Sequence, residues 1–204
     1  VHQMALATLE KLGLKEESVT KFQTGGPDGD LGSNEILLSK DKTLTVVDGS
    51  GVLHDPEGLD RDELVNLAKK RQMVSSFDCA KLSPMGFLVL LDDKDRTLPD
   101  GTIVQSGMNF RNSLHTLKFA AADIFVPCGG RPDSISANNV QKVIRPDGTP
   151  LWKAVIEGAN LFITQEARLI LEEAGVIVMK DASANKGGVC CSSYEVLAAL
   201  CFTD

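Results

Sequence analysis

The sequence predicts an α/β fold built on one doubly wound, mostly parallel sheet of about six strands, with helices on both faces. Two observations predict this fold class. Segments with the pattern of strands alternate with segments that have the apolar period of helices. A glycine-rich loop, "TGGPDGDLG", also joins the first strand to the helix that follows it. Because doubly wound sheets grow outward from their first strand, we expect that strand to lie centrally.

Local signals mark the individual elements. Asp60 can cap one helix and Glu63 completes a capping box, while Thr164 can cap a later helix that Gly175 ends in the left-handed conformation. The predicted strands cover residues 18–24, 43–48, 85–93, 123–130, 153–160 and 176–181, with a short extended piece at 100–107. The predicted helices cover residues 1–12, 31–39, 60–70, 109–121, 164–175 and 187–201.

Composition narrows the class of protein. The 204 residues are 43% hydrophobic and 24% charged, which is typical of a soluble globular protein, and we expect a single domain. The net charge of −7 argues against nucleic acid or an anionic membrane surface as a partner. No apolar run approaches the roughly 20 residues of a membrane-spanning helix. The five cysteines show no C-x-x-C spacing and no zinc-like pattern with histidine, so we expect reduced thiols, no metal site and an intracellular protein.

The glycine loop stands where a strand–helix–strand unit binds the phosphates of a dinucleotide. Its glycines follow the spacing G-x-x-G-x-x-G, at Gly26, Gly29 and Gly32, rather than G-x-G-x-x-G. We expect Gly25 and Gly26 to allow a sharp turn, Gly29 to let the backbone approach a pyrophosphate, and Gly32 to permit close packing of helix and strand. The helix N-terminus adds N–H groups for the anion. Asp28 and Asp30 would repel a pyrophosphate, so we expect them to point away and cap N–H groups. A simple turn is the alternative interpretation.

Asp48 supplies a second signal. It ends the second predicted strand, 19 residues after Gly29. An acidic residue about 20 residues beyond the glycine loop binds the adenosine ribose in dinucleotide-binding folds. A carboxylate there accepts hydrogen bonds from both ribose hydroxyls and repels a 2′-phosphate, and no arginine or lysine occurs in residues 49–55 to offset that repulsion. The sequence therefore favours NAD over NADP.

Longer motifs resemble a known family. The motifs are "FQTGGPDGDLGSNEI", "GSGVLHDPEGLDRDEL", "FVPCGGRPDSIS", "VIEGANLFITQEARLILEEAGVIVMKDASANKGGV" and "SSYEVLAAL". In this order they resemble the NAD-specific glutamate dehydrogenases of the large-subunit class over nearly the whole chain. They are similar, more distantly, to the cofactor domain of smaller glutamate dehydrogenases. The resemblance implies that residues 1–204 form a Rossmann-like NAD-binding domain.

The resemblance also implies cofactor-binding residues. The family's pyrophosphate loop falls on Gly26, Gly29, Asp30, Leu31 and Gly32, and its ribose-binding acid falls on Asp48.

On the nicotinamide side, Pro127 and Cys128 would run past the ribose and the nicotinamide ring. Gly158 belongs to the "EGAN" strand end, Asn160 would lie near the carboxamide, and Asn185 would lie beside the ring. Asn160 could instead cap the next helix.

The same resemblance places Val189 beside the nicotinamide and Ser192 against the distal carboxylate of glutamate. Ser192 could instead bond to the backbone of its own helix. The loop Gly129-Gly130-Arg131 replaces the Ala-Thr-Gln of smaller relatives, so their polar contacts do not carry over to it.

The implied activity is the oxidative deamination of L-glutamate to 2-oxoglutarate and ammonia, with hydride transfer to NAD. The family takes its catalytic lysine and a nearby aspartate from a separate substrate domain. The only comparable motif here, "NKGG", places Lys186 on the cofactor side. We therefore expect a cofactor domain cut from a longer polypeptide, with no catalytic residue of its own and no activity in isolation.

Two alternatives stay open at this point. One is the NAD-binding domain of another amino acid dehydrogenase, such as a leucine or phenylalanine dehydrogenase. The other is a non-catalytic module that senses a nucleotide. For the parent protein we expect a homo-oligomer that acts on glutamate and 2-oxoglutarate in the cytoplasm or the mitochondrion.

Overall fold

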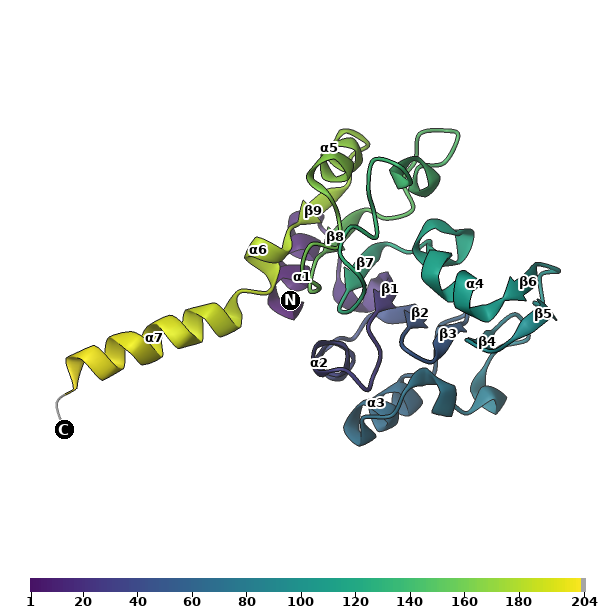
Figure 1. The fold of residues 1–204 in the computed structure, drawn as a ribbon, viewed down its shortest axis with the longest axis horizontal. Helices are drawn as coiled ribbons and strands as arrows, with labels where there is room; N and C mark the ends of the chain where they lie inside the picture. Colours follow the sequence, from purple (N-terminus) through teal and green to yellow (C-terminus); the bar gives the residue numbers. More distant parts are fainter. Residues whose placement is uncertain (203–204) are drawn as a thin grey trace.

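The computed structural model describes residues 1–202 and contains a long twisted sheet with helices on both faces (Figure 1). The strands are β1 Thr20–Thr24, β2 Lys42–Val47, β3 Gly51–His54, β4 Phe87–Leu90, β5 Lys94–Thr97, β6 Ile103–Ser106, β7 Ile124–Pro127, β8 Ala154–Ile156 and β9 Ile177–Met179. The α-helices are α1 His2–Lys11, α2 Asp30–Leu38, α3 Arg61–Lys70, α4 Gly107–Ser113, α5 Gln165–Glu173, α6 Asp181–Ala184 and α7 Gly187–Cys201. Short 3-10 helices occupy Glu16–Ser18, Val74–Ser76, Cys79–Lys81, Leu114–Thr116, Lys118–Ala120 and Val140–Val143.

Seven strands form the main sheet in the order β4-β3-β2-β1-β7-β8-β9. The central strand β1 pairs in parallel with β2 on one side and β7 on the other, and β8 and β9 continue the parallel ladder. The predicted mostly parallel sheet with a central first strand is thus confirmed. The chain builds one half of the sheet up to β4 and crosses to the other half before β7, so the carboxyl ends of β1 and β7 flank the switch point of the fold.

The strand prediction missed two strands. Strand β3 was not predicted; it lies between β2 and β4 and pairs antiparallel with both, so the predicted buried strand at residues 85–93 runs in the same direction as β2 but joins the sheet through antiparallel pairing. Strand β5 was also missed, because its sequence KDRT is charged and mostly exposed. It pairs with β6 in a separate two-stranded sheet, which contains the extended piece expected at residues 100–107.

Both predicted N-caps are present, but the Glu63 side chain pairs with Lys81 at 3.3 Å and does not complete the predicted capping box. The Asp60 side chain accepts a hydrogen bond from the Glu63 backbone N–H, and Thr164 accepts one from Ala167 at the start of α5. Gly175 follows α5 with a φ of 89°. The helix predicted over residues 109–121 is only partly α-helical, because α4 gives way to two 3-10 turns after Ser113.

Side-chain alternation along the strands creates two apolar faces. Phe22 of β1 and Phe125 of β7 stack at 4.5 Å between ring centroids, on the face that α4 and α5 cover. Trp152 packs against the Phe125 ring at 4.8 Å between ring centroids and donates its indole N–H to the Ala120 carbonyl. On the other face, Ile124 and Val126 pack against α1, while α2 and α3 cover the outer strands. The two-sided helix cover is as predicted.

Helix α7 extends away from the body of the molecule (Figure 1), and none of its residues is buried. Among residues 1–202, no helix is both long enough and apolar enough to cross a lipid bilayer.

The buried histidine of β3 predicts a pH dependence of stability. Burial lowers the pKa of His54 to about 4, although Asp55 and Asp100 act in the opposite direction. Because the unfolded histidine titrates near pH 6.5, its neutral form stabilises the fold above that pH, and this contribution is lost as the pH falls from 6.5 towards 4. Urea unfolding at several pH values gives the free energy of unfolding as a function of pH. Between pH 6.5 and 4 this free energy should fall less steeply for His54→Gln than for the unmodified chain. An identical slope would mean that this ring is not buried in its neutral form.

Candidate functional site

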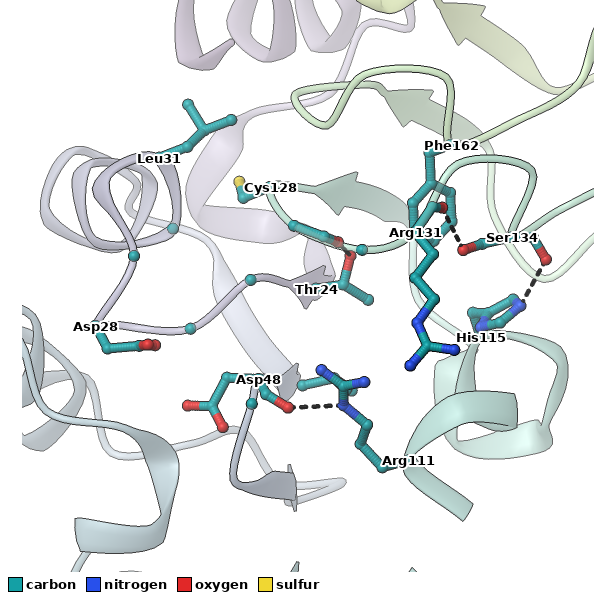
Figure 2. A pocket seen from close by; sticks show the side chains of 18 of the residues that line it. Thr24, Asp28, Leu31, Asp48, Arg111, His115, Cys128, Arg131, Ser134 and Phe162 are labelled. Atoms are coloured by element: carbon teal, nitrogen blue, oxygen red, sulfur yellow. Dashed lines mark hydrogen bonds between the residues drawn. The ribbon is translucent and has the colours of Figure 1, made fainter. Parts of the chain in front are cut away.

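A cleft of about 520 Å³ lies at the carboxyl ends of β1, β2 and β7, beside the switch point of the sheet. The glycine loop, the end of β2, helix α4 and the loop after β7 form its walls (Figure 2). Its lining contains these predicted site residues: Gly26, Gly29, Asp30, Leu31, Gly32, Asp48 and Cys128.

Close backbone contacts explain two of the loop glycines. A Cβ at Gly26 would collide with the side chain of Asp48, and one at Gly32 would collide with the carbonyl oxygens of Gly25 and Gly26. Gly25 itself has a φ of 88° and lies against the backbone of Gly129 in the loop after β7. The expected sharp turn is therefore present, and Gly32 of α2 packs against the loop where it leaves β1, while its carbonyl accepts a hydrogen bond from Gln23 of that strand.

The loop presents an open helix N-terminus to the cleft. Gly29 is the N-cap residue of α2, and no side chain among residues 1–202 caps this end. A Cβ at Gly29 would have only one neighbour, the Gly26 oxygen at 3.7 Å, so its backbone is accessible. Gln23 braces the loop from behind through hydrogen bonds from Nε2 to the carbonyls of Gly25 and Gly32, at 2.8 and 3.1 Å. Free N–H groups at a helix N-terminus suit an anionic ligand.

The two loop aspartates do not cap N–H groups as expected. Asp30 lies at the start of α2 with an almost fully exposed side chain, and it forms an ion pair with Arg71 at 2.8 Å. That arginine follows α3 with a φ of 54° and reduces the negative charge near the loop. Asp28 lines the cleft near Gly26.

Asp48 is buried and already holds three protein groups. Oδ1 accepts hydrogen bonds from the N–H and the hydroxyl of Ser50, at 2.8 and 2.7 Å. Oδ2 accepts one from the Val74 N–H at 2.7 Å. A carboxylate offers about four acceptor positions, so this geometry leaves room for roughly one more hydrogen bond, at Oδ2. Hydrogen bonds from both ribose hydroxyls would need two open acceptor positions, one more than this geometry offers.

Two arginines that line the cleft were missed at the level of sequence. Arg111 of α4 donates from Nε to the Asp48 carbonyl at 2.8 Å, and Arg131 follows the Gly129-Gly130 turn. Figure 2 shows both side chains extending into the cleft. Arg111 is 63 residues away from its carbonyl partner, so no local pattern marks it. The positive charges of both arginines partly offset the negative charge of the carboxylates around the glycine loop.

The far wall of the cleft is formed by His115 and Phe162. The histidine Nε2 lies 2.8 Å from the Ser134 carbonyl, and its ring meets Phe162 edge-on at 5.8 Å. Gly130 has a φ of 145° and packs against the same phenylalanine ring. Cys128 also lines the cleft, and burial raises the pKa of its thiol.

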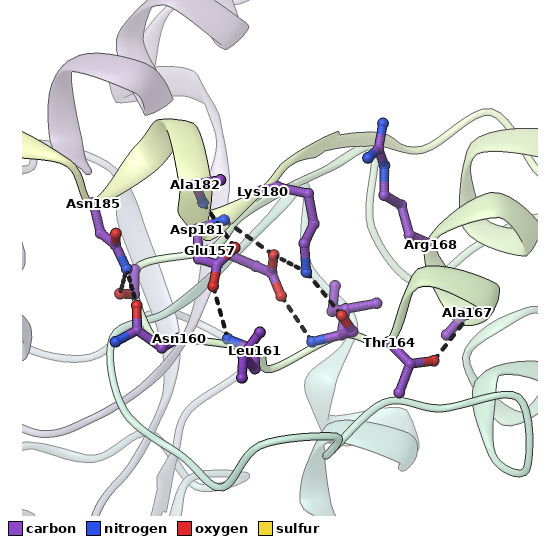
Figure 3. Close-up of polar contacts among 12 residues, drawn as sticks. Glu157, Asn160, Leu161, Thr164, Ala167, Arg168, Lys180, Asp181, Ala182 and Asn185 are labelled. Carbon is purple, nitrogen blue, oxygen red and sulfur yellow. Dashed lines mark hydrogen bonds and ion pairs between the residues drawn. The ribbon is translucent and has the colours of Figure 1, made fainter.

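A second group of predicted residues lies beside the cleft, at the ends of β7 and β8. A Cβ at Gly158 would come within 2.7 Å of the Leu31 side chain and 3.1 Å of the Pro127 carbonyl. Asn185 donates from Nδ2 to the Gly158 carbonyl at 2.9 Å and to Asn160 Oδ1 at 2.7 Å (Figure 3). The structure therefore gathers these residues at one edge of the sheet, and helix α5 is capped by Thr164 instead of Asn160.

The two predicted substrate-binding residues lie elsewhere. Val189 and Ser192 sit on the projecting helix α7, and neither lines the cleft. The Ser192 hydroxyl donates to the Gly188 carbonyl at 2.9 Å, which is the alternative that the sequence left open. Residues 1–202 also contain no cluster of three or more histidine, cysteine or acidic side chains that could hold a metal ion.

The doubly wound sheet, with a glycine loop at its switch point, defines a Rossmann-like domain. The sequence profile of the Glutamate/Leucine/Phenylalanine/Valine dehydrogenase family matches residues 1–203, and the chain belongs to this family.

Several relatives are similar over the whole chain. It is 60% identical to glutamate dehydrogenase 2 of Dictyostelium discoideum, over 100% of the chain and 20% of the relative. It is 57% identical to the NAD-specific glutamate dehydrogenase of Saccharomyces cerevisiae, over 96% of the chain and 18% of the relative. The chain thus spans about a fifth of the length of these relatives.

Solved structures share the fold. Plasmodium falciparum glutamate dehydrogenase matches with a TM-score of 0.61 and 18% identity, over 94% of the chain and 36% of that structure. Hetero-hexameric glutamate dehydrogenase from Thermus thermophilus matches with a TM-score of 0.61 and 18% identity, over 98% of the chain and 39% of that structure.

Proposed function

We propose that residues 1–204 are the NAD-binding domain of a glutamate dehydrogenase that transfers a hydride from L-glutamate to NAD and releases 2-oxoglutarate and ammonia. The observation that carries this proposal is the uncapped N-terminus of α2 behind a glycine loop, in a cleft at the switch point of the sheet. Relatives named NAD-specific glutamate dehydrogenases, at 57–58% identity, support the choice of cofactor and substrate.

The residues of the cleft fit a dinucleotide. The backbone at Gly26, Gly29 and Gly32 would hold the pyrophosphate: the absence of a Cβ at Gly26 and Gly32 lets the loop pack tightly, and a Cβ at Gly29 would have only one neighbour, the Gly26 oxygen at 3.7 Å. Asp48 Oδ2 would accept a hydrogen bond from the adenosine ribose. When bound, the nicotinamide supplies the hydride acceptor, and the protein supplies its orientation.

The amino acid itself would be bound elsewhere in the parent protein. Among residues 1–202, no lysine lines the cleft, so this part offers no base of the kind that deamination requires. We propose that the catalytic lysine and its aspartate lie in a substrate domain of the longer parent, and that the 204 residues alone do not turn over glutamate. Val189 and Ser192 stay candidate substrate contacts only if that domain packs against α7.

Assembly and location are further parts of the proposal. The name of the Thermus thermophilus structure describes a hetero-hexamer, which supports an oligomeric parent, and we propose a homo-oligomer. We also propose an intracellular protein of the cytoplasm or the mitochondrion, which the scattered cysteines support.

Asp48 provides the test of the cofactor. Calorimetry on the chain should show NAD binding at least about tenfold tighter than NADP binding, because a 2′-phosphate would approach a buried carboxylate. In Asp48→Asn the ratio of the two affinities should fall towards one, because the charge is removed.

Asp55 offers a matched control. It is equally buried and holds the N–H of Glu57 together with the N–H and hydroxyl of Ser83, but it lies outside the cleft. Asp55→Asn should therefore cost stability in a similar way and leave the NAD to NADP ratio unchanged. Equal binding of NAD and NADP to the unmodified chain would contradict the assignment of Asp48 to the ribose.

A further inference from the structure

The loop between β8 and α5 is held by buried charges that the cofactor contacts described above do not include. Glu157 follows β8 and is completely buried. Its Oε1 accepts a hydrogen bond from the Ile163 N–H at 2.7 Å, and its Oε2 forms a 2.7 Å ion pair with Lys180. Lys180 Nζ donates in turn to the Ile163 carbonyl at 2.8 Å. The ion pair thus binds both backbone groups of one residue at the far end of the loop (Figure 3).

A second carboxylate holds the middle of the same loop. Asp181 accepts hydrogen bonds from the Leu161 N–H at 2.9 Å and from the Ala182 N–H at 2.7 Å. Leu161 has a φ of 56°, which is a left-handed conformation that costs energy for a residue with a branched side chain. The Asp181 N–H also donates to Glu157 Oε2 at 3.2 Å, so both acidic groups form one network. The network maintains a backbone shape that the loop would not adopt alone.

The shape of this loop sets the direction of two amides. Asn160 directly precedes the left-handed residue, and its Oδ1 accepts the hydrogen bond from Asn185. With Oδ1 engaged in this way, the Asn160 NH₂ is turned away from its partner, and it has no hydrogen-bond acceptor among residues 1–202. The asparagine pair therefore presents amide groups in a fixed orientation at the carboxyl end of β8.

The position of this pair along the sheet identifies its ligand. The proposed pyrophosphate loop follows β1 and the proposed ribose acid follows β2, on one side of the switch point. A dinucleotide that crosses the strand ends must place its other half over β7 and β8. Gly158 contacts Leu31 of the glycine loop region, so the asparagine pair adjoins the cleft on that side. The nicotinamide carboxamide is the group in that half of NAD that offers both an NH₂ donor and a carbonyl acceptor, as the side-chain amides of an asparagine pair do.

We propose that Glu157 and Lys180 are positioning residues for the nicotinamide: their ion pair fixes the loop 158–163 so that Asn160 and Asn185 meet the carboxamide. This inference rests on the proposed function, because it requires NAD in the cleft. Neither charged group touches the cofactor. Loss of the ion pair would let the loop relax, and the amides would lose their orientation while the adenosine half of the site stays intact.

The test compares NAD with ADP-ribose, which has the same adenosine and pyrophosphate but lacks nicotinamide. In Glu157→Gln we expect NAD affinity to fall about tenfold, while ADP-ribose affinity changes less than about twofold. The separate variant Lys180→Arg keeps a cation within reach of the Glu157 carboxylate, so it should retain most of the NAD affinity of the unmodified chain. If Glu157→Gln does not fold, Glu157→Asp keeps the charge but retracts the oxygens from Ile163, and it should show the same selective loss.

The matched control is Asp123→Asn. Asp123 pairs with Lys153 at 2.7 Å and binds Thr20, but it lies at the opposite, amino-terminal ends of β7 and β8. This variant should change both affinities equally or not at all. Equal losses of NAD and ADP-ribose in Glu157→Gln, or no loss of either, would overturn the positioning role. Failure of the unmodified chain to bind ADP-ribose would instead reject the proposed function, and the inference with it.

Discussion

Replacing Lys21 by methionine is expected to lower the free energy of unfolding by about 3–5 kcal/mol. Lys21 lies in β1 and is fully buried; its Nζ is 2.9 Å from Asp41, 3.6 Å from Glu35 and 2.8 Å from the Ser39 hydroxyl. The methionine would leave the buried Asp41 without a cation and Glu35 with only His2, at 3.4 Å, and removal of one partner from a buried ion pair is strongly destabilising. Urea unfolding with a fixed m-value measures the loss.

Lys153→Met is the matched control for this loss. Its Nζ forms a similar 2.7 Å pair with Asp123, but the lysine side chain is 58% exposed. Exposed pairs contribute at most about 1 kcal/mol. If both variants lose the same small amount of stability, the group around Lys21 is solvated in solution and does not act as a buried charge network.

Gly32→Ala is expected to weaken NAD binding by more than about tenfold and to lower stability by about 1–3 kcal/mol. The added Cβ would collide with the carbonyl oxygens of Gly25 and Gly26, which are backbone atoms and cannot rotate away. The loop would have to shift, and its N–H groups would lose the arrangement that suits a pyrophosphate. Calorimetry and thermal unfolding of the same preparations measure the two effects.

Gly29→Ala separates the roles of the two glycines. A Cβ there would make only an ordinary contact, at 3.7 Å from the Gly26 oxygen, so the fold should keep its stability. NAD affinity should still fall, because the methyl group would stand where the backbone approaches the phosphates. Unchanged NAD affinity in both glycine variants would show that the loop is a structural turn and that the dinucleotide binds elsewhere.

Much of the sheet could be predicted because its central strands carry their own signals. The segment around Phe22 is rich in β-branched residues, the run ending at Pro127 and the short strand before Glu157 are apolar, and all three lead into glycine-bearing loops. Strand β3 was missed because only three residues separate it from β2, and the run appeared as one strand followed by a loop. The antiparallel pairing of β4 could not be predicted, because it depends on the unpredicted strand β3, which lies between β4 and β2 and runs in the opposite direction to both.

The site was predictable where a backbone role requires a specific residue. Glycine at positions 26 and 32 follows from contacts that exclude a Cβ, and such requirements leave a pattern in the sequence. Arg111 left no pattern, because its role depends on α4 reaching the end of β2 through tertiary packing. The prediction that Asp30 caps N–H groups failed because Arg71, from a separate helix, offers a stronger partner.

The central claim is that the cleft beside the glycine loop binds NAD, and a crystal structure of the chain grown with NAD tests it most directly. We expect the pyrophosphate against the backbone at Gly29 and Gly32, the adenosine ribose beside Asp48, and the nicotinamide directed towards Asn160. NAD bound at any other surface, with the glycine loop free of ligand, would contradict the claim.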